Sequence, residues 1–182
     1  MFHDGRVEVD VKGYYEGGFI TPAKWKLPKG LDNALAAQAM FPVTSPDEMA
    51  GHKGENDVAD AISLARAAGP KGAWALLSKR LAAIPEYVQL FKAAFPGEIK
   101  SGSGIRFTHA ANSIAAFQST AFRADDSPFD QYLRGDQSTL NEDQLAGMEL
   151  FYGKASCVDW RRPPLLRGGA LCFSALCCSG AL

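Results

Sequence analysis

Gln38 and Glu48 are the two polar side chains with catalytic potential in one short stretch, residues 35–51. The amide of Gln38 can both donate and accept hydrogen bonds, and the carboxyl of Glu48 can release and take up a proton. Pro42 and Pro46 stiffen the loop between them, because each proline fixes its own φ and restricts the residue before it. These residue types are equally those of an ordinary solvated loop. The pattern therefore allows proton-transfer chemistry without requiring it.

Short helices separated by glycine and proline must position this stretch. Asp32 or Asn33 is expected to cap the first helix, Pro85 suits the first turn of a later one, and Asn141 with Gln144 forms a capping-box pattern. The expected helices are 33–41, 56–68, 72–84, 85–95, 105–122, 128–133 and 141–153. The remaining N-terminal segment is rich in loops, with a strand-like alternation at residues 7–11.

Length and composition point to a mainly α protein of one domain or slightly more. The chain has 182 residues, 47% of them hydrophobic, and alanine is abundant. A net charge of −1 gives no support for a nucleic-acid or membrane-surface binder. The first residues lack a basic region followed by an apolar one, so no secretory signal is visible. The apolar C-terminal residues are fewer than the roughly 20 of a membrane span.

The four cysteines, Cys157, Cys172, Cys177 and Cys178, all fall near the C-terminus. A disulfide framework would be spread through the domain that it staples, and the spacing fits no zinc site. Residues 160–182 contain no Asp or Glu and show neither helical nor strand periodicity. This irregular tail is interpreted as a segment that was not selected to fold with the rest.

Five stretches that occur in order identify a family resemblance. They are FHDGRVEVD, LAAQAMFPVTSPDEMAG, HAANSIAAF, SPFDQYLRGD and GMELFYGKASC. Together they resemble the bacterial di-haem cytochrome c peroxidases and their methylamine-utilisation relatives, over residues 2–157. The resemblance implies cytochrome c-like helical domains, each with haem c attached through C-x-x-C-H. Residues 1–140 would be a partial peroxidatic domain, 141–157 the start of a second such domain, and 158–182 a non-homologous tail.

The resemblance also implies a function and gives roles to named residues. One haem would take electrons from a small c-type cytochrome or a cupredoxin, and the other would reduce hydrogen peroxide to water. Gln38 and Glu48 match the family's pair over the peroxidatic haem: Gln38 would orient the peroxide and Glu48 would move protons between its oxygens. His3 stands where many members carry the tryptophan between the haems. A periplasmic location, a calcium ion between the domains and a homodimer are further expectations from the family.

The sequence departs from the family at both haem-attachment motifs. The first would precede Phe2, and the second should begin at Cys157 but reads Cys157-Val158-Asp159-Trp160-Arg161. Arginine has no lone pair to offer iron, so Cys157 is a remnant of the motif. A frameshift near codon 159 and a truncated start would explain both departures. The alternative function is a non-catalytic helical fragment without haem, either a pseudogene product or an interaction module.

Several other residues are expected to have structural roles. His109 is predicted to be packed on its helix, His52 to be a solvated loop residue, and Trp74 and Met148 to lie in the core. Without haem, the apolar helix faces would surround empty volume, which predicts a loosely packed helical state.

Overall fold

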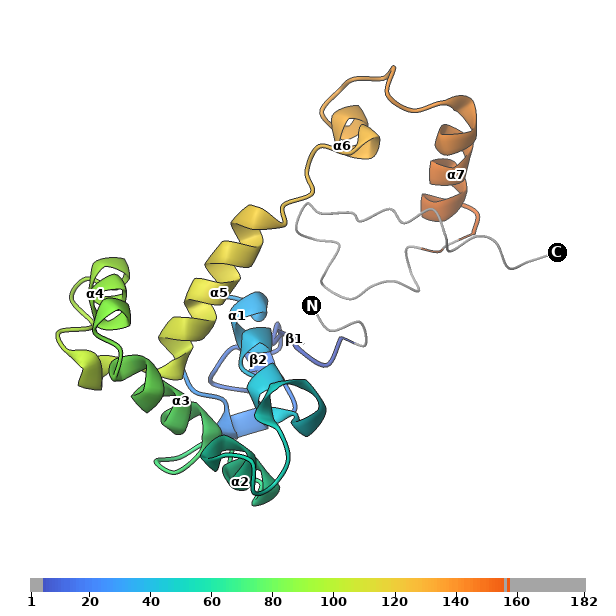
Figure 1. Cartoon of the computed structure of the whole chain (residues 1–182). Coiled ribbons are helices and arrows are strands. Elements are labelled where there is room, and N and C mark those ends of the chain that lie inside the picture. The colour runs from blue at the N-terminus through green and yellow to red at the C-terminus, as the bar shows by residue number, and fades with distance from the viewer. Residues whose placement is uncertain (1–4, 156, 158–182) are drawn as a thin grey trace. The chain divides into compact units, whose positions relative to one another are not determined.

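The protein is mainly α-helical, as the sequence predicts. The computed structural model describes residues 5–155 and 157 (Figure 1). The chain divides into two compact units, Met1–Ala121 and Phe122–Leu182. The described part of the first unit holds a two-stranded antiparallel sheet with short helices, and that of the second holds two helices.

The first unit alternates short turns with α-helices. In chain order its elements are β1 (Glu8–Val9), β2 (Phe19–Ile20), η1 (Lys24–Lys26), α1 (Ala34–Ala39), η2 (Pro42–Thr44), η3 (Pro46–Ala50), α2 (Asp57–Ser63), α3 (Ala73–Ala82), α4 (Pro85–Ala94), η4 (Gly102–Gly104) and α5 (Phe107–Ala121). β1 pairs with β2 so that Val9 faces Phe19. α5 packs against α1 and α3, which places the longest helix at the centre of this unit.

Local sequence signals set most of the helix ends. Asn33 caps α1 by accepting a hydrogen bond from the Ala36 amide, and Asn56 caps α2 through the amides of Val58 and Ala59. Pro85 occupies the first turn of α4, where its missing N–H costs no hydrogen bond.

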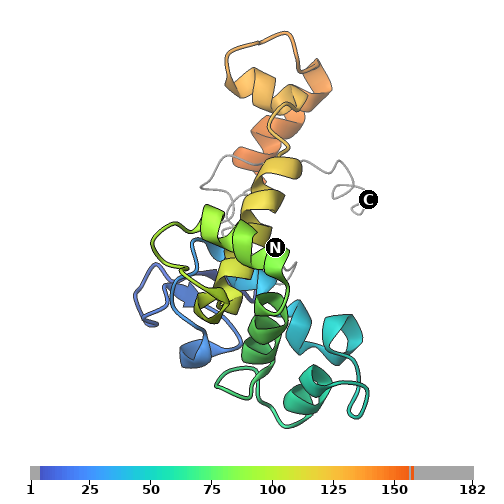
Figure 2. The same ribbon diagram turned by 60° about the vertical axis from the view of Figure 1, so that its left-hand side comes forward.

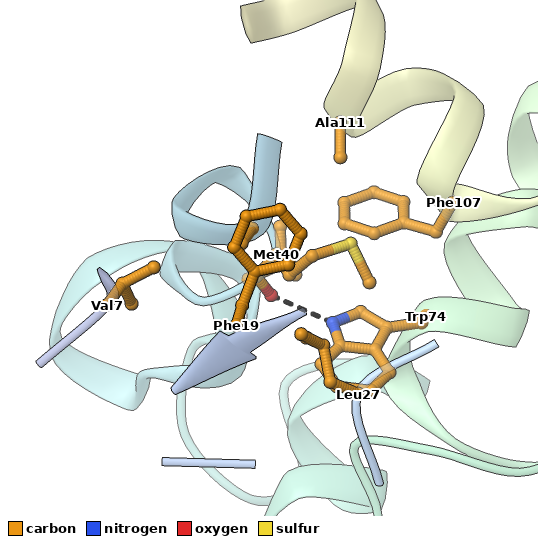
Figure 3. Packing of buried hydrophobic residues seen from close by; sticks show 9 residues of the cluster. Val7, Phe19, Leu27, Met40, Trp74, Phe107 and Ala111 are labelled. Atoms are coloured by element: carbon orange, nitrogen blue, oxygen red, sulfur yellow. Dashed lines mark hydrogen bonds between the residues drawn. The ribbon is translucent and has the colours of Figure 1, made fainter. Parts of the chain in front are cut away.

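The main core lies where the N-terminal loops, α1, α3 and α5 meet (Figure 3). Its buried members are Val7, Phe19, Leu27, Ala37, Met40, Val43, Trp74, Phe107 and Ala111. The sulfur-containing side chain of Met40 is fully buried, and the Trp74 indole is only 4% exposed. This confirms Trp74 as a core residue. A smaller cluster of Phe91, Ile99 and Ile105 fixes α4 to the start of α5.

The second helix is shorter than expected. The pattern 56–68 predicts one helix with Val58, Ile62 and Ala65 on one face, but α2 ends at Ser63. Ala65 adopts a left-handed φ of 54°, so the predicted helix is wrong beyond Ser63. A left-handed alanine ends a helix because the next amides can no longer reach the i−4 carbonyls.

The second unit contains α6 (Pro128–Leu133) and α7 (Glu142–Tyr152). Reciprocal capping boxes begin both helices, Ser127 with Asp130 and Asn141 with Gln144. No residue of α7 is buried, and Met148 is half-buried, so the prediction of Met148 as a core residue is wrong. Among the described residues, too little packs against the apolar side of α7 to bury the sulfur.

Candidate functional site

A cleft of about 470 Å³ opens in the first unit, between the end of α1, the two turns after it, and α3 and α5. Its walls are mainly aliphatic and aromatic, with three polar side chains. They are formed by Gln38, Ala39, Pro42, Val43, Met49, Leu77, Arg80, Leu81, Ile84, Phe107, Ala110, Ile114 and Gln118. A large, mostly apolar cleft with a few polar groups has the character of a cofactor or ligand site.

Gln38 lines this cleft and carries a buried, unpaired acceptor. It lies in the last turn of α1, and its side-chain Oε1 is buried without a hydrogen-bond partner among the described residues. Leaving such a group unpaired costs about 1–3 kcal/mol, so buried polar atoms normally have a partner. An unpaired acceptor on a residue that lines a cleft is a candidate contact for the O–H or N–H donor of a bound molecule.

The main chain beside Gln38 is held by a buried hydrogen bond from another helix. The Trp74 indole Nε1–H donates to the carbonyl oxygen of Met40 at 2.8 Å, drawn as a dashed line in Figure 3. Thr44 adds a second tether, because its hydroxyl donates to the Phe41 carbonyl at 2.7 Å. Gln38 therefore sits on a segment fixed from both α3 and η2.

Glu48 lies on a different kind of element, the π-helical turn η3. The carbonyl of Ser45 accepts hydrogen bonds from the amides of Glu48, Met49 and Ala50, at 3.2, 3.2 and 3.0 Å. Figure 2 shows α2, in teal, beside α3, and η3 packs against α2. Within this turn Met49 lines the cleft, while Glu48 is exposed and does not.

The far end of η3 is tethered by Asn56. Its side-chain Nδ2 donates to the Ala50 carbonyl at 3.0 Å, while Oδ1 caps α2. Gly51 joins the two at φ 79° and ψ −179°, and a Cβ there would lie 2.5 Å from a carboxylate oxygen of Glu55. The positive φ is what favours glycine here, since the exposed Glu55 side chain could move away from a Cβ. The position of Glu48 is thus set by a glycine turn and one asparagine.

Arg80 brings a positive charge to the edge of the cleft. Its guanidinium pairs with Asp57 at the start of α2, and both side chains are about half exposed, 51% and 55%. An exposed pair of this kind contributes little stability, so the guanidinium remains available to an anionic group of a ligand. Sequence reasoning missed Arg80, whose spacing on α3 with Leu77 and Leu81 was the available signal.

The structure places the predicted site residues in different environments. Gln38 lines the cleft, whereas Glu48 is exposed outside it, so the two are not brought together in one cavity. Cys157 is half-buried with a free thiol, and His3 lies outside the described residues. Their catalytic and cofactor roles stay predictions.

His109 is packed away from the cleft, as the sequence predicts. It is 3% exposed; its Nδ1 accepts the Arg106 amide at 3.0 Å and its Nε2 lies 3.4 Å from the Glu98 carboxylate. Burial lowers the pKa of His109 below its usual 6.5, opposed by the bond to Glu98 and assisted by the charge of Arg106. The neutral imidazole therefore accepts the hydrogen bond of the Arg106 amide at the N-terminal turn of α5.

Within residues 5–155 and 157, no cluster of three or more His, Cys, Asp or Glu side chains could hold a metal ion. None of the helices in this part of the chain is long and apolar enough to cross a membrane.

Comparison with known proteins gives consistent matches. A family model described as di-haem cytochrome c peroxidase matches residues 1–138. The methylamine utilization protein MauG of Methylorubrum extorquens is 34% identical over 128 residues, which are 70% of this chain and 29% of that protein. Cytochrome-c peroxidase IdrP1 of Pseudomonas sp. is 31% identical over 157 residues, 84% of this chain and 38% of that protein.

A third relative matches a shorter region. Cytochrome c551 peroxidase of Pseudomonas aeruginosa is 41% identical over 76 residues, 42% of this chain and 21% of that protein. The chain thus spans between 21% and 38% of the length of these three relatives. No solved structure matches it significantly.

Proposed function

This chain belongs to the di-haem cytochrome c peroxidase family, and from that membership we propose that it forms part of an enzyme that reduces hydrogen peroxide to water. The reaction would take place at a haem c held in the cleft beside Gln38. The observation that carries the proposal is the buried Oε1 of Gln38, which has no partner among the described residues and belongs to a mainly apolar wall. Peroxide and water are both O–H donors that satisfy such an acceptor.

The residues of the cleft fit a haem. Leu77, Leu81, Phe107 and Ile114 offer apolar surface to a flat macrocycle, and the guanidinium of Arg80 suits one of its carboxylates. When bound, haem supplies the iron that exchanges electrons with peroxide. This fit concerns the binding of the ring; covalent attachment needs the C-x-x-C-H that the sequence does not complete at Cys157.

In this proposal the chain's own residues orient the peroxide and move its proton. Gln38 accepts a hydrogen bond from the peroxide and fixes its direction in the cleft. Glu48 takes a proton from one peroxide oxygen and delivers it to the other, as a general base and then a general acid. Because Glu48 is exposed outside the cleft in this structure, η3 must bring it inward for that step. The adjoining Met49 already reaches the cleft.

The remaining family properties are proposals that rest on membership. They comprise a small c-type cytochrome or a cupredoxin as electron donor, a periplasmic location, a homodimer, a calcium ion, and His3 between the two haems. We also propose the domain limits 1–140 and 141–157, with 158–182 as a non-homologous tail. The family match to residues 1–138 supports the first of these limits.

Haem titration of the full chain tests the proposal. Addition of ferric haem should give a Soret band that saturates at stoichiometric haem. Ala110→Trp fills the cleft and should abolish saturation, whereas Ala116→Trp, on an exposed position of the same helix, should bind as the wild type does. Equal binding by both variants would place haem elsewhere and overturn the assignment.

Peroxide consumption by the haem-loaded chain then tests the proposed roles of Gln38 and Glu48. Glu48→Gln should slow it on the order of 10²-fold, the usual share of one proton-transfer group. Gln38→Leu should keep haem binding while losing rate.

The second candidate, a helical fragment without haem, is favoured by the exposed Glu48 and the incomplete motif at Cys157. Expression with a haem-maturation system, followed by a pyridine haemochrome spectrum, separates the two. Stoichiometric covalent haem would eliminate the fragment, and a chain that binds haem neither covalently nor reversibly would establish it.

A further inference from the structure

The N-terminal loops carry an exposed group of aromatic and basic side chains outside the cleft. Lys12 and Tyr14 lie between the two strands, and Lys24, Trp25 and Lys26 form η1; these five residues are here called the basic aromatic surface. Trp25 is 78% exposed and Tyr14 69%, the most exposed aromatic rings in the described part of the first unit. Large exposed aromatic rings on a protein surface commonly mark an interaction site.

The loop under Tyr14 is built rigidly. The carboxylate of Asp10 is buried and accepts hydrogen bonds from the amides of Lys12 at 3.2 Å and Tyr15 at 2.6 Å. Phe19 and Leu27, which follow the loop and η1, are members of the main core. The exposed rings are therefore presented by a fixed scaffold, and little conformational entropy is lost when a partner binds them.

Lys24 holds an unusual backbone conformation at the start of η1. Its φ is 50°, one of two positive values among the described non-glycine residues. A left-handed residue that is neither Gly, Asn nor Asp costs on the order of 1 kcal/mol and persists where the surrounding structure imposes it. Here the buried Leu27 amide closes the turn by donating to the Lys24 carbonyl at 3.3 Å. The result is that Trp25 faces solvent.

A hollow of about 220 Å³ lies beside these rings. Tyr14, Tyr15, Phe19, Trp25 and Leu27 give it apolar walls. Glu16 and Lys29 also line it and pair with each other, so Lys24 brings the unpaired ammonium group. A space of this size admits one apolar side chain. An apolar hollow with an unpaired cation at its edge favours a ligand that combines an apolar group with negative charge.

The charge of this region is opposite in sign to that of the whole chain. Residues 11–30 contain four lysines and one glutamate, a net +3, whereas the chain carries −1. Glu16 pairs with Lys29. In the described part of the chain, Lys12 and Lys24 have no carboxylate partner and lie 5.9 and 6.0 Å from the ring centres of Tyr14 and Trp25. These ammonium groups remain free to meet carboxylates of a partner.

We propose that the basic aromatic surface docks an acidic segment of another protein. One apolar side chain of the partner enters the hollow, and flanking carboxylates lie over Lys12, Lys24 and Lys26. The hollow favours a protein segment over a lipid surface. A side chain can fill the hollow, whereas a lipid surface would need only exposed rings and lysines that lie in one plane. The inference concerns a partner site separate from the cleft, and it holds whether or not the chain binds haem.

Binding of a dye-labelled synthetic peptide to the full chain, followed by anisotropy, tests this inference. The peptide carries one phenylalanine flanked on both sides by glutamates, and the matched control peptide has glycine in place of phenylalanine. The first should bind at least tenfold more tightly than the second, and its affinity should fall with added salt because exposed charges are screened.

Variants locate the peptide on the surface. Trp25→Ala should weaken binding about tenfold or more, as truncation of an aromatic anchor does. Combined Lys12→Glu, Lys24→Glu and Lys26→Glu should abolish it, and Lys26→Glu alone should weaken it. The controls are Leu90→Ala, an exposed apolar residue of α4, and Lys53→Glu, an exposed lysine near η3; both should leave affinity unchanged. Circular dichroism checks that each variant retains its helices.

The alternative occupant, a lipid surface, is tested by binding of the full chain to vesicles of phosphatidylcholine with phosphatidylserine. Binding of the peptide with no dependence on Trp25 would overturn the proposal. Trp25-dependent binding to vesicles with no binding to the peptide would overturn it in favour of a lipid surface.

Discussion

The segments that carry Gln38 and Glu48 are close in sequence but differ in how the fold holds them. The Gln38 segment ends at Met40, which is fully buried and bound through its carbonyl to Trp74 (Figure 3). The Glu48 segment is a turn of five residues in which only Ala50 is buried. The first is part of the core, whereas the second is attached to the core at its ends.

In the proposed reaction, this difference would suit two separate tasks. A group that fixes the direction of a substrate must itself be immobile, and the core holds Gln38 in that way. A group that carries protons can be supplied by a mobile element, since lids and loops commonly complete a site after the substrate has bound. Substitutions in the two segments should therefore have unequal effects on stability.

The methionines give the largest contrast. Met40→Ala should lower the free energy of unfolding by about 2–5 kcal/mol, because it leaves a cavity where a fully buried side chain was. Met49→Ala, at a side chain that is 68% exposed, should change it by no more than about 0.5 kcal/mol. Urea unfolding of the unloaded chain measures both. Equal losses would show that the two segments are held alike.

The indole tether of the Gln38 segment comes next. Trp74→Phe removes the donor to the Met40 carbonyl and should cost about 1–3 kcal/mol, since that oxygen is left buried and unpaired. Trp25→Phe, at an exposed ring, is the matched control and should be nearly neutral. Both are read from the midpoint of urea unfolding, and a neutral Trp74→Phe would remove the tether from the argument.

The amide tether of the Glu48 segment should have a smaller effect. Asn56→Asp keeps the cap of α2 but cannot donate to the Ala50 carbonyl, which should cost about 1 kcal/mol. Asn33→Asp makes the same exchange at a cap whose only side-chain bond is to the Ala36 amide, so it should be neutral. Hydrogen exchange at the amides of η3 should speed up in the first variant alone.

Substitutions of Gln38 and Glu48 should have different effects on the stability of the unloaded chain. Gln38→Leu removes a buried acceptor without a partner and should stabilise the unloaded chain by up to about 1 kcal/mol. Glu48→Gln, on the surface, should stay within about 0.5 kcal/mol of the wild type. A destabilising Gln38→Leu, measured by thermal unfolding, would mean that the amide already has a partner.

The smallest effect should come from His109. This residue lies on α5, which packs against α1 and so supports the Gln38 segment. Burial lowers the pKa of His109, so between pH 6.5 and the lower folded-state pKa the unfolded chain binds more protons. Stability contributed by neutral His109 is therefore complete above about pH 6.5 and falls with pH down to the folded-state value. His109→Gln should flatten the pH dependence of the urea midpoint over that range.

The sequence predicted the helical framework well where a local signal was sufficient. Asn33, Asn141 and Pro85 act within a few residues of themselves, so their spacing alone placed three helix starts. Trp74 was predicted as core because its stripe on α3 could face only inward. The family, too, follows from the order of short stretches along the chain, which the match to residues 1–138 confirms.

The tertiary structure determined the side-chain environments that depend on contact between helices distant in sequence. The sequence predicted that Gln38 and Glu48 act together. The burial of the Gln38 amide and the exposure of the Glu48 carboxyl depend instead on which sides of α1, α3 and α5 meet. The left-handed Ala65, the bond from Trp74 to Met40 and the approach of Arg80 to the cleft have the same origin. Periodicity along a chain fixes the direction of a side chain within its own helix, whereas its environment is fixed by residues tens of positions away.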